Sequence, residues 1–466
     1  GGLFAALTGA ELDGHRYADA AVANGAVAIL SERPLPLPIP QIVVPDSRAA
    51  LAILANAFFG YPSHELAAVI GITGTDGKTT TSYILENILR HAGRSVGVIG
   101  TVGIRIGNGV SYDLGHQTTP ESHLNQSYLR EMADAGIEHA IVESTSHGLA
   151  MHRLDGTAFR IAGVTNVTHE HLEYHKTIEN YRRAKAILIE RVAENHGVVV
   201  LNADDPGASS MSAWAAGADV VHYGIHRDDS HLSAHNVVAR NDGSDFQLRI
   251  GIERNHLHLP LVGEFNVANA LLAAGLANAL GIAATTIAEA LSKPVAVPGR
   301  MHRIDAGQPF NVVVDYAHTP ESLTKILTLL RGLHPGSRLI AVFGSAGDRD
   351  VQKRPMQGRV AAELADYAIF TNEDPRREDA EKILRDIASG AIERDGVEGR
   401  TFEIVVDRRA AIALAFERAQ PGDCVLLAGK GHEQSISWNG IELPWDETTV
   451  AEELLAERGY TSRILS

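Results

Sequence analysis

Cysteine, long apolar runs and positive charge are all scarce in this chain. Cys424 is the single cysteine among 466 residues, so a disulfide framework is excluded. It lies in the apolar run Asp423-Cys-Val-Leu-Leu427, which is typical of a buried strand in a protein of a reducing compartment. No apolar run approaches the roughly 20 residues that span a bilayer. We therefore expect a cytoplasmic protein without membrane insertion.

No signal peptide is visible at the start of the sequence. The chain begins at Gly1 without an initiator Met, so we expect its natural N-terminus to lie upstream. Acidic residues outnumber basic ones, 57 against 41, and the net charge of −16 argues against a broad nucleic-acid contact surface. A length of 466 residues exceeds one ordinary core, which predicts two or three domains.

A glycine-rich run with a lysine and two threonines is the most informative feature that is present. It reads Gly71-Ile-Thr-Gly-Thr-Asp-Gly-Lys-Thr-Thr80. The apolar residues 66–73 predict a buried parallel strand before it, and apolar residues at helical spacing predict a helix that runs to Gly93. Such a loop binds phosphate through backbone N–H groups and a helix N-terminus, with Lys78 on the β- and γ-phosphates and the Thr79 hydroxyl on Mg²⁺. The sequence therefore predicts ATP binding.

One position departs from the usual phosphate-loop pattern, because Ile72 stands where the first glycine is expected. The alternative is a glycine-rich turn that carries an incidental lysine. The order Gly-Lys-Thr between a strand and a helix argues against that alternative.

Strand-like and helix-like runs alternate almost throughout, which predicts an α/β protein with mostly parallel sheets. We expect three domains: residues 1–65 form a small α/β domain that is incomplete at its start, residues 66–298 a central phosphate-loop ATPase domain, and residues 299–466 a Rossmann-like, doubly wound domain. Prolines mark the second boundary, at Pro294 and Pro298.

Three further features of the central segment could carry chemistry. Ala140-Ile-Val-Glu143 is a strand that ends in a carboxylate, either a Mg²⁺ ligand or a salt-bridged strand end. His169, His171 and His175 suggest a metal site, but histidines without cysteine are weak evidence and could decorate a solvated loop. Lys185 lies at the start of a predicted helix, where a lysine is most often a surface charge.

Polar residues follow four predicted strands of the third segment. They form the sets Asp315-Tyr-Ala-His318, Gly344-Ser-Ala-Gly-Asp-Arg-Asp350, Glu373-Asp-Pro-Arg376 and Gly429-Lys-Gly-His-Glu433. Each set alone is best explained as a turn, but the carboxyl ends of parallel strands meet at one sheet edge. Arginine pairs with carboxylates and Asp or Glu with ammonium groups. The four sets together favour a pocket for a zwitterionic or dibasic small molecule.

Taken in order, these motifs resemble those of the Mur ligase family, the ATP-dependent amide ligases of peptidoglycan precursor synthesis. The resemblance is strongest to members that add the third residue of the stem peptide, and it covers essentially the whole chain. It is carried by Leu3-Phe-Ala-Ala-Leu-Thr-Gly9 with Asp13-Gly-His15, by Gly74 to Thr80, Thr118-Thr-Pro120, Glu143-Ser-Thr-Ser-His147, Asn202-Ala-Asp-Asp-Pro206, Gly263 to Asn269, and Gly299-Arg300.

The resemblance assigns roles in ATP and metal binding to particular residues. It implies that Lys185 is N-carboxylated and that this carbamate binds Mg²⁺ together with Thr79, Glu143 and His171. Lys78, Lys185, Glu143 and His171 are the implied catalytic residues. The implied ATP-binding residues are Gly74, Thr75, Asp76, Gly77, Lys78, Thr79, Thr80, Asn269, Arg300 and Asp315. Asp76 stands where the family usually has Asn.

The resemblance also assigns two substrate-binding sets. The implied set for the UDP-sugar peptide is Thr118, Thr119, Thr145, Met151 and Arg153. The implied set for the amino acid is Arg349, Glu373, Asp374, Pro375, Arg376, Gly429 and Glu433. Met151 replaces a common Gln, Thr145 a usual Ser, and Ser345-Ala346 a common Cys-Gly. Glu373-Asp374 replaces the Asp-Asn of members that add meso-diaminopimelate.

The implied reaction joins a dibasic amino acid to the D-Glu side-chain carboxylate of UDP-MurNAc-L-Ala-D-Glu through an acyl phosphate, with ATP and Mg²⁺. Arg376 favours meso-diaminopimelate, whereas the extra charge of Asp374 could accept the free ammonium of L-lysine or L-ornithine. Another Mur-type or folylpolyglutamate ligase and a catalytically silent nucleotide-binding protein are the remaining hypotheses. We expect a monomer that binds no nucleic acid.

Overall fold

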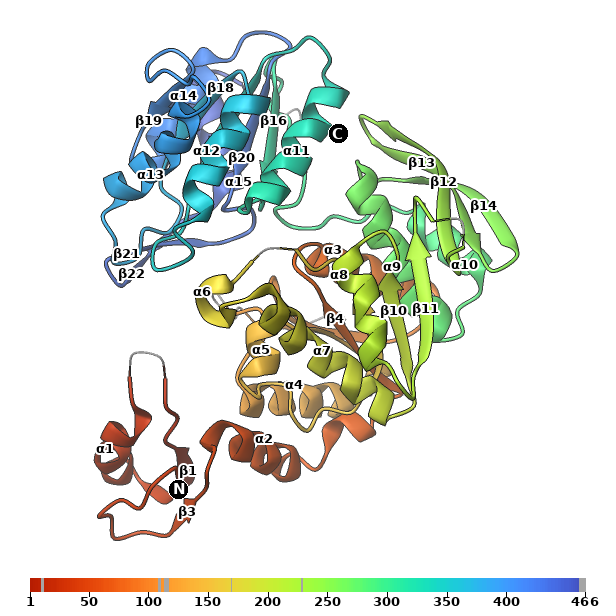
Figure 1. Cartoon of the computed structure of the whole chain (residues 1–466), viewed down its shortest axis with the longest axis vertical. Helices are drawn as coiled ribbons and strands as arrows, with labels where there is room; N and C mark the ends of the chain where they lie inside the picture. The colour runs from red at the N-terminus through yellow and green to blue at the C-terminus, as the bar shows by residue number, and fades with distance from the viewer. Residues whose placement is uncertain (10–11, 108–109, 113–116, 169, 228, 461–466) are drawn as a thin grey trace.

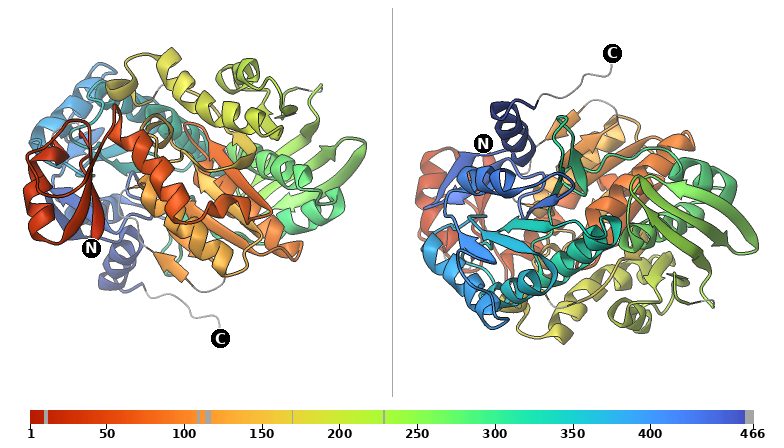
Figure 2. Two further views of the ribbon diagram at one scale, coloured as in Figure 1. Left: turned by 90° about the horizontal axis from the view of Figure 1, so that it is seen from below. Right: turned by 90° about the horizontal axis from the view of Figure 1, so that it is seen from above.

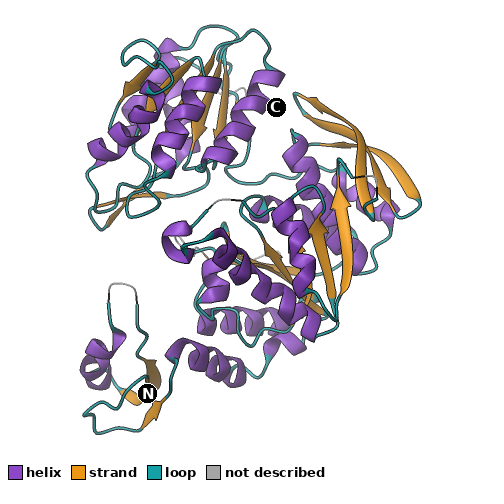
Figure 3. Ribbon diagram, in the orientation of Figure 1, coloured by secondary structure: helices purple, strands orange, loops and turns teal. Residues whose placement is uncertain are grey.

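The computed structural model describes residues 1–9, 12–107, 110–112, 117–168, 170–227 and 229–460, and its described strands form three large sheets and one small hairpin (Figure 1). The predicted α/β class with three domains and a mostly parallel central sheet is confirmed. Along the long axis, the N-terminal sheet and the C-terminal sheet lie at opposite ends of the molecule (Figures 1 and 3). Within the described residues, no helix has the length and apolar character needed to cross a membrane.

The N-terminal sheet has three parallel strands in the order β1-β2-β3. Its strands are β1 (Gly2–Ala5), β2 (Ala26–Ser31) and β3 (Gln41–Val43), and its helices are η1 (Gly14–Tyr17), α1 (Ala18–Ala23), α2 (Ser47–Phe58) and η2 (Pro62–His64). The Asp46 side chain caps α2 by accepting from two backbone N–H groups. Arg48 of α2 contacts Glu121 of the central segment at 3.2 Å, which ties this region to the next.

The central sheet has eleven strands in the order β14-β13-β12-β11-β10-β9-β4-β8-β5-β6-β7. Its parallel part consists of β4 (Ala68–Thr73), β5 (Val96–Gly100), β8 (His139–Glu143), β9 (Phe159–Val164), β10 (Val198–Asn202) and β11 (Asp219–Gly224), and β12 also pairs in parallel with β11. β4 lies in the middle and is buried along its whole length. The strand predicted before the phosphate loop is therefore a central strand of this sheet.

Helices cover both faces of the central sheet. They are α3 (Lys78–His91), α4 (Ser122–Asp134), α5 (Ser146–Ala150), α6 (Leu172–His175), α7 (Ile178–Glu194), α8 (Pro206–Ser209), η3 (Ser210–Trp214), α9 (Glu264–Ala279) and α10 (Ala284–Leu291). Alternate residues of β4 point to opposite faces, so Ile70 packs in the core with α3, α9 and α10, and Val69 packs in the core with α4 and α7. Two apolar cores therefore hold the strand that precedes the loop.

Antiparallel strands extend the central sheet at both ends, and the sequence interpretation did not include them. One extension is β6 (Gly103–Ile106) and β7 (Val110–Tyr112), and the other is β12 (Leu232–Arg240), β13 (Gly243–Ile250) and β14 (Glu253–Leu259). The longer extension projects beyond the helices in all views (Figures 1 and 2).

The C-terminal sheet has six strands in the order β15-β16-β20-β17-β18-β19. They are β15 (His302–Ile304), β16 (Asn311–Asp315), β17 (Leu339–Phe343), β18 (Tyr367–Phe370), β19 (Phe402–Ile404) and β20 (Cys424–Ala428), and only β15 is antiparallel to its neighbour. A hairpin of β21 (Ser435–Trp438) and β22 (Ile441–Pro444) follows.

Helices on both faces make the C-terminal sheet doubly wound, as predicted. One face carries α11 (Pro320–Leu333), α12 (Lys353–Leu364) and α13 (Ala380–Ile392), and the other carries α14 (Arg408–Arg418) and α15 (Glu447–Glu457). Because β16, β20, β17 and β18 are adjacent, the polar residues that follow them lie at one sheet edge. Cys424 is buried in β20, as expected.

Candidate active site

The phosphate loop joins β4 to α3, as the sequence predicts. Gly74 and Gly77 have positive φ angles of 143° and 86°, which favour glycine at these two positions. A Cβ on Gly77 would lie 2.3 Å from Asn269 Oδ1, so the first turn of the loop and α9 touch there. Gly71 belongs to β4 and not to the loop, where a Cβ would lie 2.6 Å from Leu188. Its role is close packing beneath the loop.

Asn166, two residues after the neighbouring strand β9, holds the loop in shape. The Asp76 backbone N–H donates to Asn166 Oδ1 at 3.0 Å, the Thr75 N–H donates to Asn166 O at 2.8 Å, and Asn166 Nδ2 donates to Asp76 O at 3.2 Å. The Asp76 side chain faces Glu170, and burial together with the nearby Glu170 charge raises the pKa of Asp76. The chain segment after β9 is therefore part of the phosphate site.

Thr79, Thr101 and Glu143 form a hydrogen-bonded set beside the loop. The hydroxyls of Thr79 and Thr101 donate to Glu143 Oε2 at 2.9 and 2.8 Å. Thr101 Oγ1 also lies 3.1 Å from Thr118 Oγ1. A Cβ on Gly100 would lie 2.3 Å from Glu143 Oε1, so glycine there gives the carboxylate its room. Glu143 ends its strand beside the loop and not in a surface salt bridge.

Lys185 is buried in the middle of α7, and its Nζ donates to Gly74 O at 2.7 Å. The expectation of a surface charge at the start of a helix is therefore wrong, because α7 begins seven residues earlier and turns this face to the loop. Lys78 Nζ donates to the same carbonyl at 2.9 Å and to Thr75 O at 2.7 Å. Burial and the nearby Lys78 charge hold the pKa of Lys185 well below its usual value.

Histidine and tyrosine rings gather next to these lysines. The His147 and His171 ring centroids are 4.7 Å apart, and those of His147 and His175 are 5.4 Å apart. The Tyr181 ring lies next to Lys185, whose Nζ is 4.4 Å from the ring centroid. In the part of the chain that the structure describes, no three His, Cys, Asp or Glu side chains form a group that could hold a metal ion. His169 lies outside the described residues, so the hypothesis of a three-histidine metal site stays a prediction.

The residues assigned to the UDP-sugar peptide lie next to Glu143. Thr119 Oγ1 donates to Glu143 O at 2.8 Å and lies 3.0 Å from Thr145 Oγ1. Arg153 Nη1 donates to Thr119 O at 2.9 Å and Arg153 Nη2 pairs with Glu121 at 2.9 Å. Met151 follows α5 and donates its N–H to His147 O. Four of the five predicted residues thus lie close together beside Glu143: Thr118, Thr119, Thr145 and Arg153. Met151 lies at the C-terminal end of α5.

The residues assigned to the nucleotide in the C-terminal segment lie around Asp315 at the end of β16. Its two oxygens accept from the Met301 and Ala317 N–H groups, each at 2.8 Å, and burial raises its pKa although Arg300 opposes the shift. The Arg300 guanidinium stacks on the Tyr316 ring at 4.5 Å. Backbone bonds thus fix Asp315 while Arg300 is held by stacking.

His318 brings the C-terminal sheet edge to the phosphate site. Its Nε2 lies 3.5 Å from Glu170 Oε1. Burial lowers the pKa of His318, but the hydrogen bond and charge of Glu170 outweigh this effect and raise the pKa. His432 lies at the same junction, where burial and the Arg300 charge lower its pKa to about 4 while a bond to the Thr101 backbone opposes them. The two halves of the candidate site therefore touch at two places.

The residues assigned to the amino acid meet at the ends of β17, β18 and β20. Lys430 is fully buried, and its Nζ pairs with Asp374 Oδ1 at 2.9 Å and with Glu433 Oε2 at 2.6 Å. Asp374 Oδ1 also accepts the Ser437 N–H at 2.9 Å. Gly429 has a φ of 101°, and a Cβ there would lie 3.1 Å from Glu373 Oε2. Pro375 and Arg349 lie on the two loops that follow β18 and β17.

Some polar groups of this region have no hydrogen-bond partner among the described residues. These are the buried Glu373 Oε2 and Ser345 Oγ, and the half-buried guanidinium of Arg376 has no ion pair within the described part of the chain. Buried polar atoms are normally satisfied, so a ligand or an ordered water completes the bonding of such groups.

Several residues of the site were not assigned from the sequence. Five of them contact assigned residues, namely Thr101, Asn166, Glu170, Tyr181 and Lys430. His318 contacts Glu170. Asn166, Glu170 and Tyr181 lie within runs that the motifs include, and His318 and Lys430 lie within the polar sets, but no residue-type signal distinguished them. Thr101 follows a short strand and carried no signal at all.

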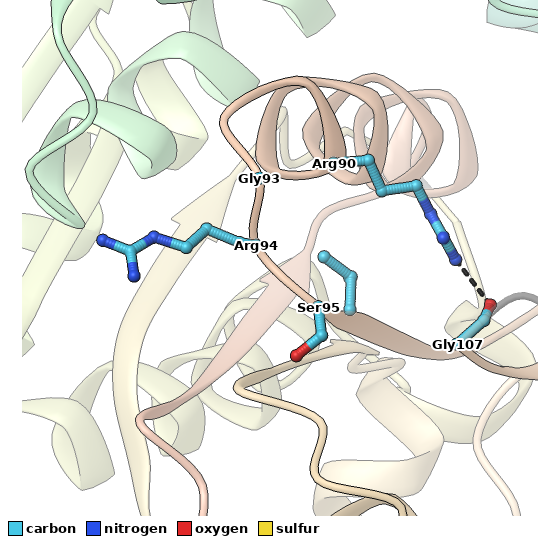
Figure 4. A pocket seen from close by; sticks show the side chains of 6 residues that line it. Arg90, Gly93, Arg94, Ser95 and Gly107 are labelled. Carbon is cyan, nitrogen blue, oxygen red and sulfur yellow. Dashed lines mark hydrogen bonds between the residues drawn. The ribbon is translucent and has the colours of Figure 1, made fainter.

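The surface hollow in Figure 4 is not part of this site. It measures about 510 Å³ and is lined by Arg90, Gly93, Arg94, Ser95, Val96 and Gly107. The hollow lies beside the C-terminal end of α3, which is roughly 20 Å from the loop at its N-terminus by the rise of a helix of that length.

The fold and the site define a Mur ligase: residues 72–277 match the Mur ligase middle domain, and residues 299–431 match the Mur ligase glutamate ligase domain. The chain belongs to the Mur ligase family, and the prediction of an ATP-dependent amide ligase of peptidoglycan precursor synthesis is confirmed.

Individual members of the family are similar to this chain over nearly its whole length. The chain is 43% identical to UDP-N-acetylmuramyl-tripeptide synthetase of Roseiflexus sp. (strain RS-1), over 99% of this chain and 93% of the relative. It is 42% identical to UDP-N-acetylmuramoyl-L-alanyl-D-glutamate–2,6-diaminopimelate ligase of Geobacillus thermodenitrificans (strain NG80-2), over 98% and 93%. A solved structure of a ligase with that same description matches with a TM-score of 0.66 and 31% identity, over 98% and 93%.

Proposed function

We propose that this chain joins meso-diaminopimelate to the D-Glu side-chain carboxylate of UDP-MurNAc-L-Ala-D-Glu, with ATP and Mg²⁺. The observation that carries the proposal is the meeting of two unlike sites at His318 and His432. One is a phosphate loop with Lys78, and the other is a sheet edge with Arg376 and Glu373. The names of the relatives in Roseiflexus and Geobacillus support the same reaction.

The central site activates the carboxylate. Phosphoryl transfer from ATP gives an acyl phosphate and ADP, and one carboxylate oxygen becomes the bridge to phosphorus. Lys78 and the loop N–H groups stabilise charge on the transferring phosphoryl group. In this structure Lys78 donates to the loop carbonyls of Gly74 and Thr75, so ATP must draw it away from them. Thr118, Thr119, Thr145 and Arg153 would hold the peptide carboxylate near Glu143.

The residues beside the loop fit Mg²⁺, provided that Lys185 is carboxylated. Thr79 and Glu143 offer the hard oxygen ligands that Mg²⁺ prefers, and His171 lies in the ring cluster close by. A free Lys185 would repel the ion. Its lowered pKa leaves the neutral amine that adds CO₂, with loss of one proton, to give an anionic carbamate. Bound Mg²⁺ would neutralise charge on the phosphate oxygens.

The C-terminal site delivers the amine. The amino group of the incoming residue attacks the acyl carbon, the C–O bond to phosphate breaks, phosphate leaves, and the amine loses a proton. Residues of this domain need only hold the amino acid in line, since the acyl phosphate is already reactive. Glu373 suits an ammonium group because its Oε2 has no partner among the described residues, whereas Glu433 is already paired with Lys430. Arg349 and Arg376 suit carboxylates.

Charge pairing in this pocket favours diaminopimelate over lysine. The extra carboxylate of Asp374 is already paired with Lys430 and with the Ser437 N–H, so it does not offer a free charge to a lysine side-chain ammonium. The Arg376 guanidinium, which has no ion pair among the described residues, would instead meet the second carboxylate. Diaminopimelate carries that group, and L-lysine and L-ornithine lack it.

The test is release of phosphate from ATP with UDP-MurNAc-L-Ala-D-Glu and one amino acid at a time. We expect release with meso-diaminopimelate at a kcat/KM about 10²-fold or more above that with L-lysine, since the site would leave Arg376 unpaired in the lysine complex. Faster phosphate release with lysine or ornithine would overturn the proposal that meso-diaminopimelate is the substrate. No release with any amino acid would overturn the assignment of this site to a ligase.

A further inference from the structure

Two neighbouring loops carry the arginines assigned to the amino acid, one arginine on each loop. Residues 344–350 follow β17 and include Arg349, and residues 371–378 follow β18 and include Arg376. The loops touch, because Gly347 N donates to Asp374 O at 2.8 Å and a Cβ on Gly347 would lie 2.1 Å from Pro375 O. The position of one arginine thus depends on the position of the other loop.

Both loops contain a strained residue at or beside the arginine. Asp348 has a φ of 52° and Arg376 a φ of 53°, the left-handed region that residues with a Cβ disfavour. Local sequence preference therefore works against both conformations. Contacts from elsewhere must hold them.

Arg354 of α12 supplies such contacts from beneath the loops. Its side chain is fully buried, and its Nη2 and Nη1 donate to Glu378 Oε1 and Oε2 at 2.8 and 2.9 Å. Nη2 also lies 3.4 Å from Ala346 O of the first loop. Glu378 Oε1 in turn accepts the Asp348 N–H at 2.6 Å, across from the second loop to the first. The Arg354 guanidinium and the Glu378 carboxylate thus hold the two loops together.

A third partner of Arg354 does not belong to either loop. Its Nη1 lies 3.1 Å from Asp386 Oδ2 on α13. The two carboxylates therefore differ in what they connect: Glu378 links Arg354 to the pocket loops, whereas Asp386 links it to a helix. This difference provides a matched pair of substitutions.

We propose that Arg354 is a positioning residue of the ligase, which acts through Glu378 to set the spacing of Arg349 and Arg376 for the carboxylates of the incoming amino acid. The inference rests on the proposed function, because that function gives the two arginines their ligand. An ion pair that serves only stability would leave substrate affinity unchanged.

The experiment compares Arg354→Lys, Glu378→Gln and Asp386→Asn in the full-length chain. Lysine keeps the charge of position 354 but cannot reach Glu378 and Ala346 O in the same planar geometry. We expect Arg354→Lys to raise the KM for meso-diaminopimelate about 10-fold to 10²-fold and Glu378→Gln about 10-fold, because small displacements of substrate-positioning groups cost this much. The KM for ATP should not change. Asp386→Asn should change neither KM and serves as the control.

Amide hydrogen exchange in residues 344–350 and 371–378 gives a second measurement that needs no turnover. Exchange should rise in both loops in Arg354→Lys and Glu378→Gln but not in Asp386→Asn. An unchanged KM for the amino acid together with unchanged exchange would overturn the inference. If the wild-type chain turned over no amino acid, the proposed function would fail, and the exchange comparison would still show whether Arg354 couples the two loops.

Discussion

The phosphate site and the amino-acid pocket differ in how their charged side chains are paired when no ligand is bound. In the phosphate site, Lys78, Thr79 and Lys185 are all bonded to other groups of the site, mainly Gly74 O and Glu143. In the amino-acid pocket, Glu373 Oε2 and the Arg376 guanidinium have no such partner within the described residues. The lysines and the Thr79 hydroxyl of the first site are paired within it, whereas the charged groups Glu373 and Arg376 of the second are not fully paired.

This difference indicates what each ligand must do. ATP, and Mg²⁺ under the proposed function, would exchange existing hydrogen bonds for new ones, which costs little net energy because each bond is replaced. Under the proposed function, the amino acid instead pairs with the buried Glu373 Oε2 and the half-buried Arg376 guanidinium, which is a strong source of discrimination between similar ligands. We therefore expect catalytic rate to depend on the first site and choice of amino acid on the second.

The largest expected effect comes from breaking the phosphate site at Lys185. Lys185→Ala removes the side chain that would become the carbamate, and we predict a fall in kcat of about 10³-fold, the scale of losing one charge-stabilising group in a transition state. Phosphate release at saturating substrate concentrations measures this fall in kcat. Acetate or propionate added to the variant should restore part of the rate. A variant with the wild-type kcat would contradict the prediction that Lys185 is carboxylated.

The next largest effect tests the amino-acid pocket. Arg376→Ala should raise the KM for meso-diaminopimelate about 10-fold to 10²-fold, because a charged hydrogen-bond pair contributes about 1.5–3 kcal/mol. The KM for ATP should stay the same, and the activity with L-lysine should fall much less. Equal losses for both amino acids would show that Arg376 does not read the second carboxylate.

The smallest effect tests a contact inside the phosphate site that the sequence did not indicate. Thr101→Val keeps the shape of the side chain but removes the hydroxyl that donates to Glu143 Oε2 and lies near Thr118. We predict about a 10-fold loss of kcat, the lower range for groups that orient a metal ligand. Thr101→Ser retains the hydroxyl and should stay near wild type; a normal rate in Thr101→Val would remove Thr101 from the site.

The sequence predicted the parts of this molecule in which local pattern and position agree. The strand 68–73, the loop and the helix from Lys78 follow directly from apolar spacing and glycine placement. The four polar sets at strand ends were expected to share an edge, and the adjacency of β16, β20, β17 and β18 confirms it. The roles of the individual site residues, the domain boundaries at 65/66 and 298/299, and a cytoplasmic monomer that binds no nucleic acid stay predictions.

Other features depend on contacts that no local pattern encodes. Lys185 looks like any helical lysine, and only the docking of α7 under the loop buries it. The pairing of Asp374 with Lys430 joins residues far apart in the sequence. The sequence does contain one signal for the antiparallel pair β12 and β13. Asp242-Gly243 between apolar runs is typical of a hairpin, but the alternation of strands and helices elsewhere led to the prediction of mostly parallel strands.

Isotope transfer tests the central claim, that the phosphate site activates a carboxylate for an amine held in the second pocket. UDP-MurNAc-L-Ala-D-Glu labelled with ¹⁸O in the D-Glu side-chain carboxylate would be turned over with ATP and meso-diaminopimelate, and the phosphate analysed by mass spectrometry. The account predicts one ¹⁸O atom in each phosphate released, in step with amide formed. Unlabelled phosphate would mean that water, and not the carboxylate, receives the phosphoryl group, and would contradict it.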